Sequence, residues 1–296
     1  MDRLTSMEMF IAVAEAHSFS VAARRLGVSA PSVTRGVNAL EERLGVKLLT
    51  RTTRSVRLTE VGAAYLPDCR RVTEDAKTID EAASGAFANP AGNLRLTAPT
   101  QFGRLYVMPI LTAFLDAYPG VSADALFVDR VVNLMDEGLD VAVRIGSLPP
   151  SELAAIRVGA VRQVVCAAPA YLDARGRPDH PHALTGHQVV LAAPVTPARE
   201  WRFGQDVAVR VAPRLTVSTV PAALDAARAG WGVTRLLSYQ VAPDVEAGRL
   251  ALVLEDFEPP ALPVHLVHPE GRRPAAKLRT FLDFAATRLR ASAARW

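Results

Sequence analysis

The chain has 296 residues, 50% of them hydrophobic and 22% charged, which allows two or three compact domains and excludes a mostly disordered protein. No run approaches about 18 uninterrupted apolar residues, so we expect no membrane span. Acidic residues Asp2, Glu8 and Glu15 interrupt the N-terminal pattern, which therefore does not resemble a signal peptide, and we expect a cytoplasmic chain. The two cysteines, Cys69 and Cys166, fit no metal or redox spacing.

The net charge of +4 comes from the N-terminal part of the chain. Residues 1–58 hold nine Lys or Arg against five Asp or Glu, whereas the remaining residues hold 25 of each sign. Within residues 19–58, the eight basic side chains are accompanied only by Glu41 and Glu42 as acids. A cationic module on a neutral body favours contact with a polyanion by the first domain. Chance clustering in an arginine-rich protein is the alternative.

The first 45 residues predict three helices. Apolar residues at helical spacing cover residues 4–16, and a second, short helix ends at Gly27. Ser29 is suited to cap a third helix, which ends at Gly45. Residues 18–37 therefore predict a helix-turn-helix unit.

The third helix carries an arginine opposite its apolar stripe. Arg35 projects away from that stripe, and Glu41 and Glu42 lie at the far end of the helix, where they would be held away from phosphate. Short donors beside one guanidinium suit base edges and phosphates in a major groove, whereas an ordinary amphipathic surface helix is the alternative. The stripe consists of Val33, Val37, Leu40 and Leu44, and the neighbours of Arg35 are Pro31, Ser32 and Asn38.

Residues 48–59 predict a two-stranded wing. Its outward arginines would lie along the DNA backbone or in the adjacent minor groove, with a solvated charged hairpin as the alternative. The inward residues are Leu48, Val56 and Leu58, and the outward ones are Arg51, Arg54 and Arg57.

A longer helix is predicted after the wing, capped by Thr59 and broken or kinked at Pro67. It carries a heptad seam, which suggests dimerisation, with packing against the chain's own body as the alternative. Cys69 in the seam is interpreted as a small apolar filler. The seam consists of Tyr65, Cys69, Val72, Ala76, Ile79 and Ala83.

A linker of small residues at 84–93 precedes alternating strands and helices, a pattern typical of α/β units with parallel sheets. About 200 residues suffice for two such lobes, with ligands at the carboxyl ends of the strands. Strands are predicted within residues 93–99, 121–128, 139–146, 162–169, 188–194, 214–218, 232–237 and 250–255, and helices within 102–117 and 132–138.

With these elements in this order, the chain resembles the LysR-type transcriptional regulators over its whole length. The resemblance implies an α/β fold class: an N-terminal winged helix-turn-helix, a linker helix and an effector domain of two periplasmic-binding-protein-like α/β lobes. Its most specific stretches are FSVAARRLGVSAPSVTRGVNALEERLGVKLLTRTTRSVRLTEVG (residues 19–62), EGLDVAVRIG (137–146), AARAGWGVTRLLSYQVAPDVEAGRL (226–250) and EPPALPVHLV (258–267).

The resemblance also implies domain boundaries. The DNA-binding domain would be residues 1–58, the linker or dimerisation helix 59–88, and the effector-binding domain 92–296. Within the effector-binding domain, lobe one would comprise 92–162 and 266–290, and lobe two 163–265.

By this resemblance, the chain is a sequence-specific DNA-binding transcriptional regulator modulated by a small polar or carboxylate metabolite bound between the lobes. Its partners would be double-stranded DNA, the small-molecule effector and RNA polymerase, and it would pair through the linker helix into homodimers that assemble into homotetramers. Ala30 stands where the family often has glutamine, so no direct adenine contact is expected there. The implied DNA-binding residues are Ser29, Pro31, Ser32, Thr34, Arg35 and Asn38 of the recognition helix, and Arg51 and Arg54 of the wing.

The implied effector site lies at the start of the helix after the first strand of lobe one. Backbone N–H groups there, with the Thr100 hydroxyl and the Gln101 amide, would form an anion cradle. Helix capping is the alternative role for the threonines and the serine of this site, and ion pairing is the alternative role for its arginine. The predicted effector-binding residues are Thr100, Gln101, Phe102, Arg144, Gly146, Thr196, Ser218 and Thr219.

Enzyme motifs are missing from the sequence: it has no Gly-rich phosphate loop, no G-x-S-x-G and no H-E-x-x-H. We therefore expect no catalytic residue, no metal and no cofactor. Two other classes remain as alternatives. A solute-binding module would need export, and an enzyme with a DNA-binding tail would need catalytic groups in the cleft.

Overall fold

The computed structural model describes residues 2–51, 56–83, 90–195, 198–204, 206–269 and 275–296. The chain divides into two compact units. One unit comprises Met1–Ala91, Asn133–Leu139 and Gly271–Arg279, and the other comprises Gly92–Val132, Asp140–Glu270 and Thr280–Trp296. Among the described residues, no helix is both long enough and apolar enough to span a bilayer.

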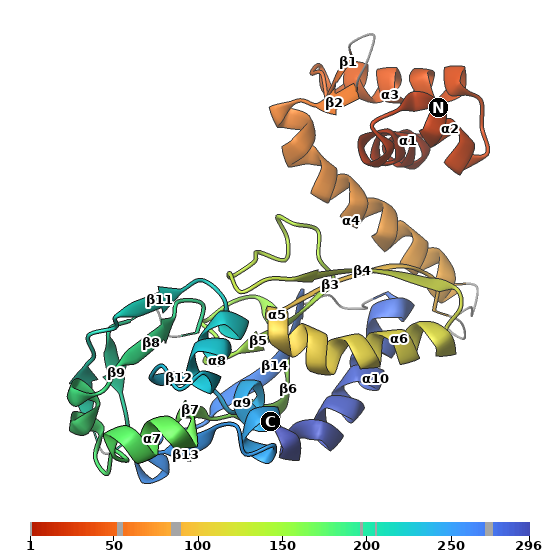
Figure 1. Ribbon diagram of the computed structural model, residues 1–296. Coiled ribbons are helices and arrows are strands. Elements are labelled where there is room, and N and C mark those ends of the chain that lie inside the picture. Colours follow the sequence, from red (N-terminus) through yellow and green to blue (C-terminus); the bar gives the residue numbers. More distant parts are fainter. Residues whose placement is uncertain (1, 52–55, 84–89, 196–197, 205, 270–274) are drawn as a thin grey trace. The chain divides into compact units, whose positions relative to one another are not determined.

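The first unit begins with helices and a short antiparallel hairpin (Figure 1). In the hairpin, Leu49 pairs with Leu58 and Arg51 pairs with Val56. The predicted helix-turn-helix and wing are therefore confirmed as secondary structure. The elements are α1 (Arg3–Ala16), α2 (Phe19–Leu26), α3 (Ala30–Leu44), β1 (Leu49–Arg51), β2 (Val56–Leu58) and α4 (Glu60–Ala83).

Local caps set the ends of α2 and α3. The side-chain oxygens of Ser18 and Ser29 each accept a hydrogen bond from the backbone N–H three residues ahead, at 3.4 and 3.3 Å. Gly27 and Gly45 end the two helices with φ angles of 65° and 70°, in the left-handed region that a Cβ disfavours. Ser29, Gly27 and Gly45 are the caps that the sequence predicts, and the Ser18 cap is an addition from the structure.

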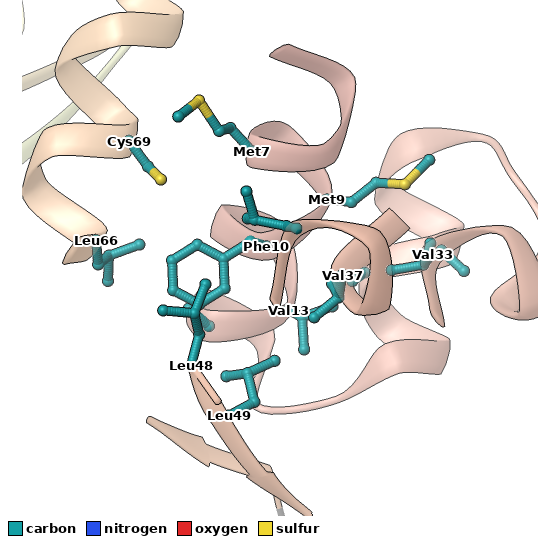
Figure 2. Close-up of a cluster of buried hydrophobic side chains, with 14 residues drawn as sticks. Met7, Met9, Phe10, Val13, Val33, Val37, Leu48, Leu49, Leu66 and Cys69 are labelled. Atoms are coloured by element: carbon teal, nitrogen blue, oxygen red, sulfur yellow. The ribbon is translucent and has the colours of Figure 1, made fainter. Parts of the chain in front are cut away.

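A single apolar core joins the three first helices to the wing and to α4 (Figure 2). Phe10 is fully buried, and Leu48 and Leu49 at the start of the wing are buried with it. The partly buried Val56 and Leu58 pack against the same cluster, as predicted, while Arg57 between them is exposed. The cluster also contains Met7, Met9, Val13, Ala14, Ala22, Ala23, Val33, Val37, Leu40, Leu66 and Cys69.

The start of the predicted heptad seam belongs to this core, so the dimerisation reading of that part of the seam is wrong. Cys69 is fully buried and Tyr65 packs against the cluster, with the Phe10 and Tyr65 ring centroids 6.2 Å apart. Burial raises the pKa of the Cys69 thiol to about 11, which fits an apolar filler. Farther along, Val72 is exposed. The helix continues through Pro67 rather than breaking there.

The second unit contains two five-stranded sheets. In the first sheet the strand order is β4-β3-β5-β14-β6, with β3 parallel to β4 and β5. The expectation of purely parallel sheets is wrong, because β14 runs antiparallel to both of its neighbours. This strand returns from late in the sequence and begins at Leu262, before the return expected at residue 266. The strands are β3 (Gly92–Ala98), β4 (Val121–Phe127), β5 (Val141–Ile145), β6 (Leu153–Val161) and β14 (Leu262–Pro269).

The second sheet has the order β11-β8-β12-β7-β13. Here β8 is parallel to β11 and β12, whereas β7 is antiparallel to β12 and β13. The strands are β7 (Gln163–Ala167), β8 (Val189–Ala192), β11 (Leu215–Val217), β12 (Val233–Leu237) and β13 (Ala251–Val253), and a separate hairpin consists of β9 (Glu200–Arg202) and β10 (Ala208–Arg210).

The helices of the second unit follow the predicted alternation only in part. The helix expected at residues 102–117 begins earlier, at Thr100, and includes a π-helical turn at Gly103–Val107. Residues 132–138 form turns instead of the predicted helix. Phe114 of α6 packs on Phe281 of α10, with ring centroids 5.1 Å apart. The helices are α5 (Thr100–Phe102), α6 (Met108–Ala117), α7 (Pro169–Arg175), α8 (Val220–Arg228), α9 (Ser238–Glu246) and α10 (Ala276–Ser292).

Gly62 is required by the close approach of α4 to the wing. A Cβ at this position would lie 2.0 Å from the carbonyl oxygen of Leu48, which itself accepts a hydrogen bond from the Thr59 N–H at 2.9 Å. We predict that Gly62→Ala lowers the free energy of unfolding of the N-terminal unit by about 1–3 kcal/mol, because backbone must move. Urea unfolding followed by circular dichroism measures this change. Gly186→Ala is the control, since a Cβ there meets nothing within 4 Å, and equal stability of both variants would contradict the prediction.

Candidate DNA-binding surface and effector site

The outward face of α3 is polar and its inward face is apolar. Arg35 and Asn38 are exposed, whereas Val33, Val37 and Leu40 are fully buried. The structure therefore places the predicted recognition residues on the face away from the core. Of the other four, Ser29 and Pro31 are exposed, and Ser32 and Thr34 are half-buried.

Hydrogen bonds organise this face. One guanidinium nitrogen of Arg35 donates to the Ser32 hydroxyl at 3.3 Å, and the hydroxyl oxygens of Ser32 and Ser29 lie 2.8 Å apart. The Thr34 hydroxyl donates to the carbonyl of Ala30 at 3.0 Å, so its hydrogen is used within the helix. Three of the six predicted helix residues are thus linked into one row, which we call the Ser29–Ser32–Arg35 row.

The wing arginines are described only in part. Arg51 lies in β1 opposite Val56, and its side chain is outside the described part of the chain. Arg54 lies wholly outside the described residues. Arg57, the third predicted outward arginine, is exposed.

Glu41 is a residue whose role the sequence analysis missed. Its side chain is buried rather than at the solvated end of α3, and its carboxylate accepts the backbone N–H groups of Leu48 and Leu49 at 3.0 and 3.1 Å. Lys47 Nζ donates to the same carboxylate at 2.7 Å. A signal was present, because Glu41 lies four residues after Val37 and therefore on the apolar stripe of the helix.

These contacts lower the pKa of the Glu41 carboxyl group. Burial acts to raise the pKa of Glu41, but the hydrogen bonds from Lys47, Leu49 and Leu48 outweigh it and hold the pKa below its ordinary value of 4.5. The carboxylate is therefore ionised at neutral pH and ties the end of α3 to the start of the wing.

The predicted anion cradle at Thr100 already holds a carboxylate of the chain. The Thr100 backbone N–H donates to Asp129 Oδ1 at 2.9 Å, and the Thr100 hydroxyl donates to the carbonyl of Phe127 at 3.4 Å. The expectation of an open N–H at Thr100 is therefore wrong for this structure. Gln101 is half-buried, and its Oε1 is buried without a hydrogen-bond partner among the described atoms.

Phe102 is a core residue, so its side chain is not available to the predicted cradle. Its fully buried ring packs against Tyr106, Tyr239 and Trp296, with centroid separations of 5.1, 5.2 and 5.1 Å. Gly159 makes room for this cluster, because a Cβ there would lie 2.3 Å from the Trp296 ring. The cluster links α5, which follows a strand of the first sheet, to α9, which follows a strand of the second.

Arg144 and Gly146 lie where β5 ends. An Arg144 guanidinium nitrogen donates to the carbonyl of Val132 at 3.1 Å, so this arginine makes a hydrogen bond to backbone. Gly146 has a φ of 110°, and its N–H donates to the carbonyl of Pro263 at 2.9 Å. Both residues hold local backbone in place.

The residues predicted from the second lobe are exposed or undescribed. The Thr219 hydroxyl accepts the backbone N–H of Ala222 at 3.4 Å and so caps α8, which is the alternative role considered for it. Ser218 is exposed beside it. Thr196 lies outside the described residues.

The depressed pKa of Glu41 predicts a pH dependence of local stability. The stabilisation is fully present above the ordinary pKa of the unfolded chain, and it is lost as the pH falls through the lower pKa of the folded state. Glu41→Gln should reduce the protection of the Leu48 and Leu49 amides at neutral pH by about 1–3 kcal/mol, and should flatten its decline toward acid pH. Amide hydrogen exchange between about pH 3 and pH 7 measures both effects.

Glu42→Gln is the matched control, because Glu42 is the exposed neighbour on the same helix. Identical exchange profiles for the two variants would show that the Glu41 carboxylate does not hold the wing.

Comparison with known proteins agrees with this architecture. The family described as bacterial regulatory helix-turn-helix protein, lysR family, matches residues 4–63, and the LysR substrate binding domain matches residues 88–290. An HTH-type transcriptional regulator of Xanthomonas campestris pv. campestris is 34% identical over 95% of this chain and 84% of its own length. The HTH-type transcriptional activator AaeR of Escherichia coli is 31% identical over 96% of this chain and 93% of its own length.

A solved structure is similar over nearly the whole chain. CrgA, a LysR-type transcriptional regulator from Neisseria meningitidis, matches with a TM-score of 0.62 and 29% identity, over 96% of this chain and 98% of CrgA. These relatives are named as regulators of transcription, so the expectation that the chain is not an enzyme is confirmed. The chain belongs to the LysR family of transcriptional regulators, and it is a DNA-binding regulator with a substrate-binding domain for small-molecule effectors.

Proposed function

We propose that this regulator contacts duplex DNA through the outward face of α3 and through the wing. The observation that carries the proposal is the division of α3 into a fully buried apolar face and an exposed polar face that presents Arg35. A recognition helix reads base edges with the side chains on its exposed face. The proposed contacts are Ser29, Pro31, Ser32, Thr34, Arg35 and Asn38, with Arg51 and Arg54 from the wing.

The domain division stays as proposed from the sequence. The family matches, which end at residue 63 and begin again at residue 88, support a DNA-binding domain at 1–58, a linker helix at 59–88 and an effector-binding domain at 92–296. The two sheets support two lobes, 92–162 with 266–290 and 163–265, with one change: β14 of the first sheet begins at Leu262, which moves residues 262–265 into lobe one.

The linker helix is the proposed surface for homodimerisation. Val61 and Val72 of α4 are both exposed, and they are eleven residues apart, which is about three helical turns and so places them on one face. Tyr65 and Cys69 lie beside this pair around the helix and enter the core. Assembly of dimers into homotetramers, contact with RNA polymerase and a cytoplasmic location belong to the same proposal.

The proposed effector is a small polar or carboxylate metabolite bound between the two lobes. The Asp129 carboxylate on the Thr100 N–H supports this, because it shows that the start of α5 accommodates a carboxylate. A ligand carboxylate would take the place of Asp129. The residues proposed for this site are Thr100, Gln101, Phe102 through its backbone, Arg144, Gly146, Thr196, Ser218 and Thr219.

Removal of Arg35 tests the DNA-binding surface. Arg35→Ala should weaken binding to the DNA upstream of its own gene by about 1–3 kcal/mol and relax the preference at one base pair, because a base contact is lost. Fluorescence anisotropy of the full-length protein at fixed salt measures the affinity. Arg202→Ala is the control, since Arg202 is an exposed arginine of the second unit, paired with Glu200. Unchanged affinity and sequence preference in Arg35→Ala would mean that α3 is oriented differently on DNA.

Removal of Asp129 tests the effector site. In Asp129→Ala the Thr100 N–H is vacant, so small organic acids should raise the melting temperature more than they do in the natural protein. A thermal-shift screen with a panel of such acids measures this. Asp173→Ala is the control, because it removes an exposed carboxylate of α7. Uniformly unchanged melting in both proteins would reject a carboxylate effector.

A further inference from the structure

The hydrogen bonds within the Ser29–Ser32–Arg35 row determine which of its donors remain for DNA. The Ser29 oxygen accepts the Ser32 backbone N–H at 3.3 Å, and the Ser32 oxygen accepts an Arg35 guanidinium N–H at 3.3 Å. The two hydroxyls are 2.8 Å apart, so one of them donates to the other. Whichever hydroxyl donates, one hydroxyl hydrogen remains for an outside acceptor.

Arg35 supplies the remaining donors. A guanidinium carries five N–H groups in a planar fork and has no acceptor, and one of the five is used on Ser32. The tie to Ser32, itself tied to the helix cap Ser29, holds the guanidinium close to the N-terminal half of α3. A side chain held in one orientation before binding loses less conformational entropy when it contacts a ligand.

A fork of N–H donors distinguishes among the four bases. In the major groove guanine presents two adjacent acceptors, O6 and N7, whereas adenine presents N7 beside an N6 amino donor. Cytosine presents an amino donor, and thymine presents a single acceptor beside a methyl group. The two N–H groups of Arg35 therefore match guanine, and adenine would set donor against donor.

We infer that Arg35 reads a guanine in the operator half-site and that Ser32 is a positioning residue that orients the Arg35 guanidinium. This inference rests on the proposed function, because it assumes that the outward face of α3 enters the major groove. It adds the identity of the base and a division of roles within the row. The Thr34 hydroxyl does not donate to a base, since its hydrogen is bonded to the carbonyl oxygen of Ala30.

The experiment begins with selection of binding sites from a randomised duplex library by the full-length protein. The selected site should contain a guanine whose replacement by 7-deazaguanine, which lacks the N7 acceptor, weakens binding by about 5- to 100-fold. In Arg35→Ala the same replacement should have no effect, because the donor that uses N7 is gone. Arg202→Ala, the control arginine, should select the same site as the natural protein.

Ser32 is tested separately. Ser32→Ala should reduce the discrimination between guanine and 7-deazaguanine, whereas Ser32→Thr, which retains a hydroxyl, should restore it. A merely structural role would lower affinity for both duplexes equally and leave the ratio unchanged. Arg35→Lys should retain part of the discrimination, because an ammonium group can donate to N7 but cannot present the planar fork.

The outcomes separate the inference from the proposed function. Suppose that the natural protein selects a defined site, and that Arg35→Ala stays equally sensitive to every guanine replacement in that site. This result would overturn the guanine contact and leave DNA binding intact. Discrimination in Ser32→Ala equal to that of the natural protein would overturn the positioning role. If the natural protein selects no site and a heparin competitor displaces all duplexes alike, the proposed DNA-binding surface itself fails.

Discussion

In the N-terminal unit, the carboxylate of Glu41 is buried and accepts the backbone N–H groups of Leu48 and Leu49 together with the ammonium group of Lys47. A buried carboxylate without such donors would be costly, so the end of α3 and the start of β1 hold each other in place. The close approach of Gly62 to Leu48 adds α4 to the same junction. The position of the wing relative to the recognition helix therefore depends on the Glu41 carboxylate together with the apolar core and the contact at Gly62.

Glu41 and Asp129 have a common property: each carboxylate accepts a hydrogen bond from a backbone N–H of its own unit. Glu41 turns inward from the end of α3, which leaves Arg35 on a helix face that lacks this negative charge. The Asp129 carboxylate accepts a hydrogen bond from the Thr100 N–H at the start of α5. In the first case the internal carboxylate clears a surface for an anionic partner, and in the second it occupies the position proposed for the carboxylate of an effector.

The ring cluster around Phe102 gives the effector site a physical connection to the second sheet. Tyr239 directly follows Ser238 in the chain. The Ser238 hydroxyl accepts a hydrogen bond from the Arg162 backbone N–H, and the Ser238 N–H donates to the Arg162 carbonyl, between β6 and β7. A displacement of α5 would therefore shift Tyr239 and strain this passage, since closely packed rings transmit movement rather than absorb it. Trp296 closes the cluster from the chain's last helical turn. The placement of Phe102 in the core thus connects α5 to α9 through ring contacts.

The sequence by itself determined the features that depend on neighbouring residues. The helix cap Ser29, the turns at Gly27 and Gly45 and the outward position of Arg35 all follow from interactions within a few residues, and the structure has them where they were predicted. Most strands of the second unit were also predicted, because continuous apolar runs mark buried strands.

Only the tertiary structure decided what distant residues do together. The bonds from Leu48 and Leu49 to Glu41, the bond from Thr100 to Asp129 and the antiparallel return of β14 each join segments whose pairing leaves no periodic mark in the sequence. The exposed face of a helix can be predicted from its own residues, but the partner of a buried face depends on how the whole chain packs.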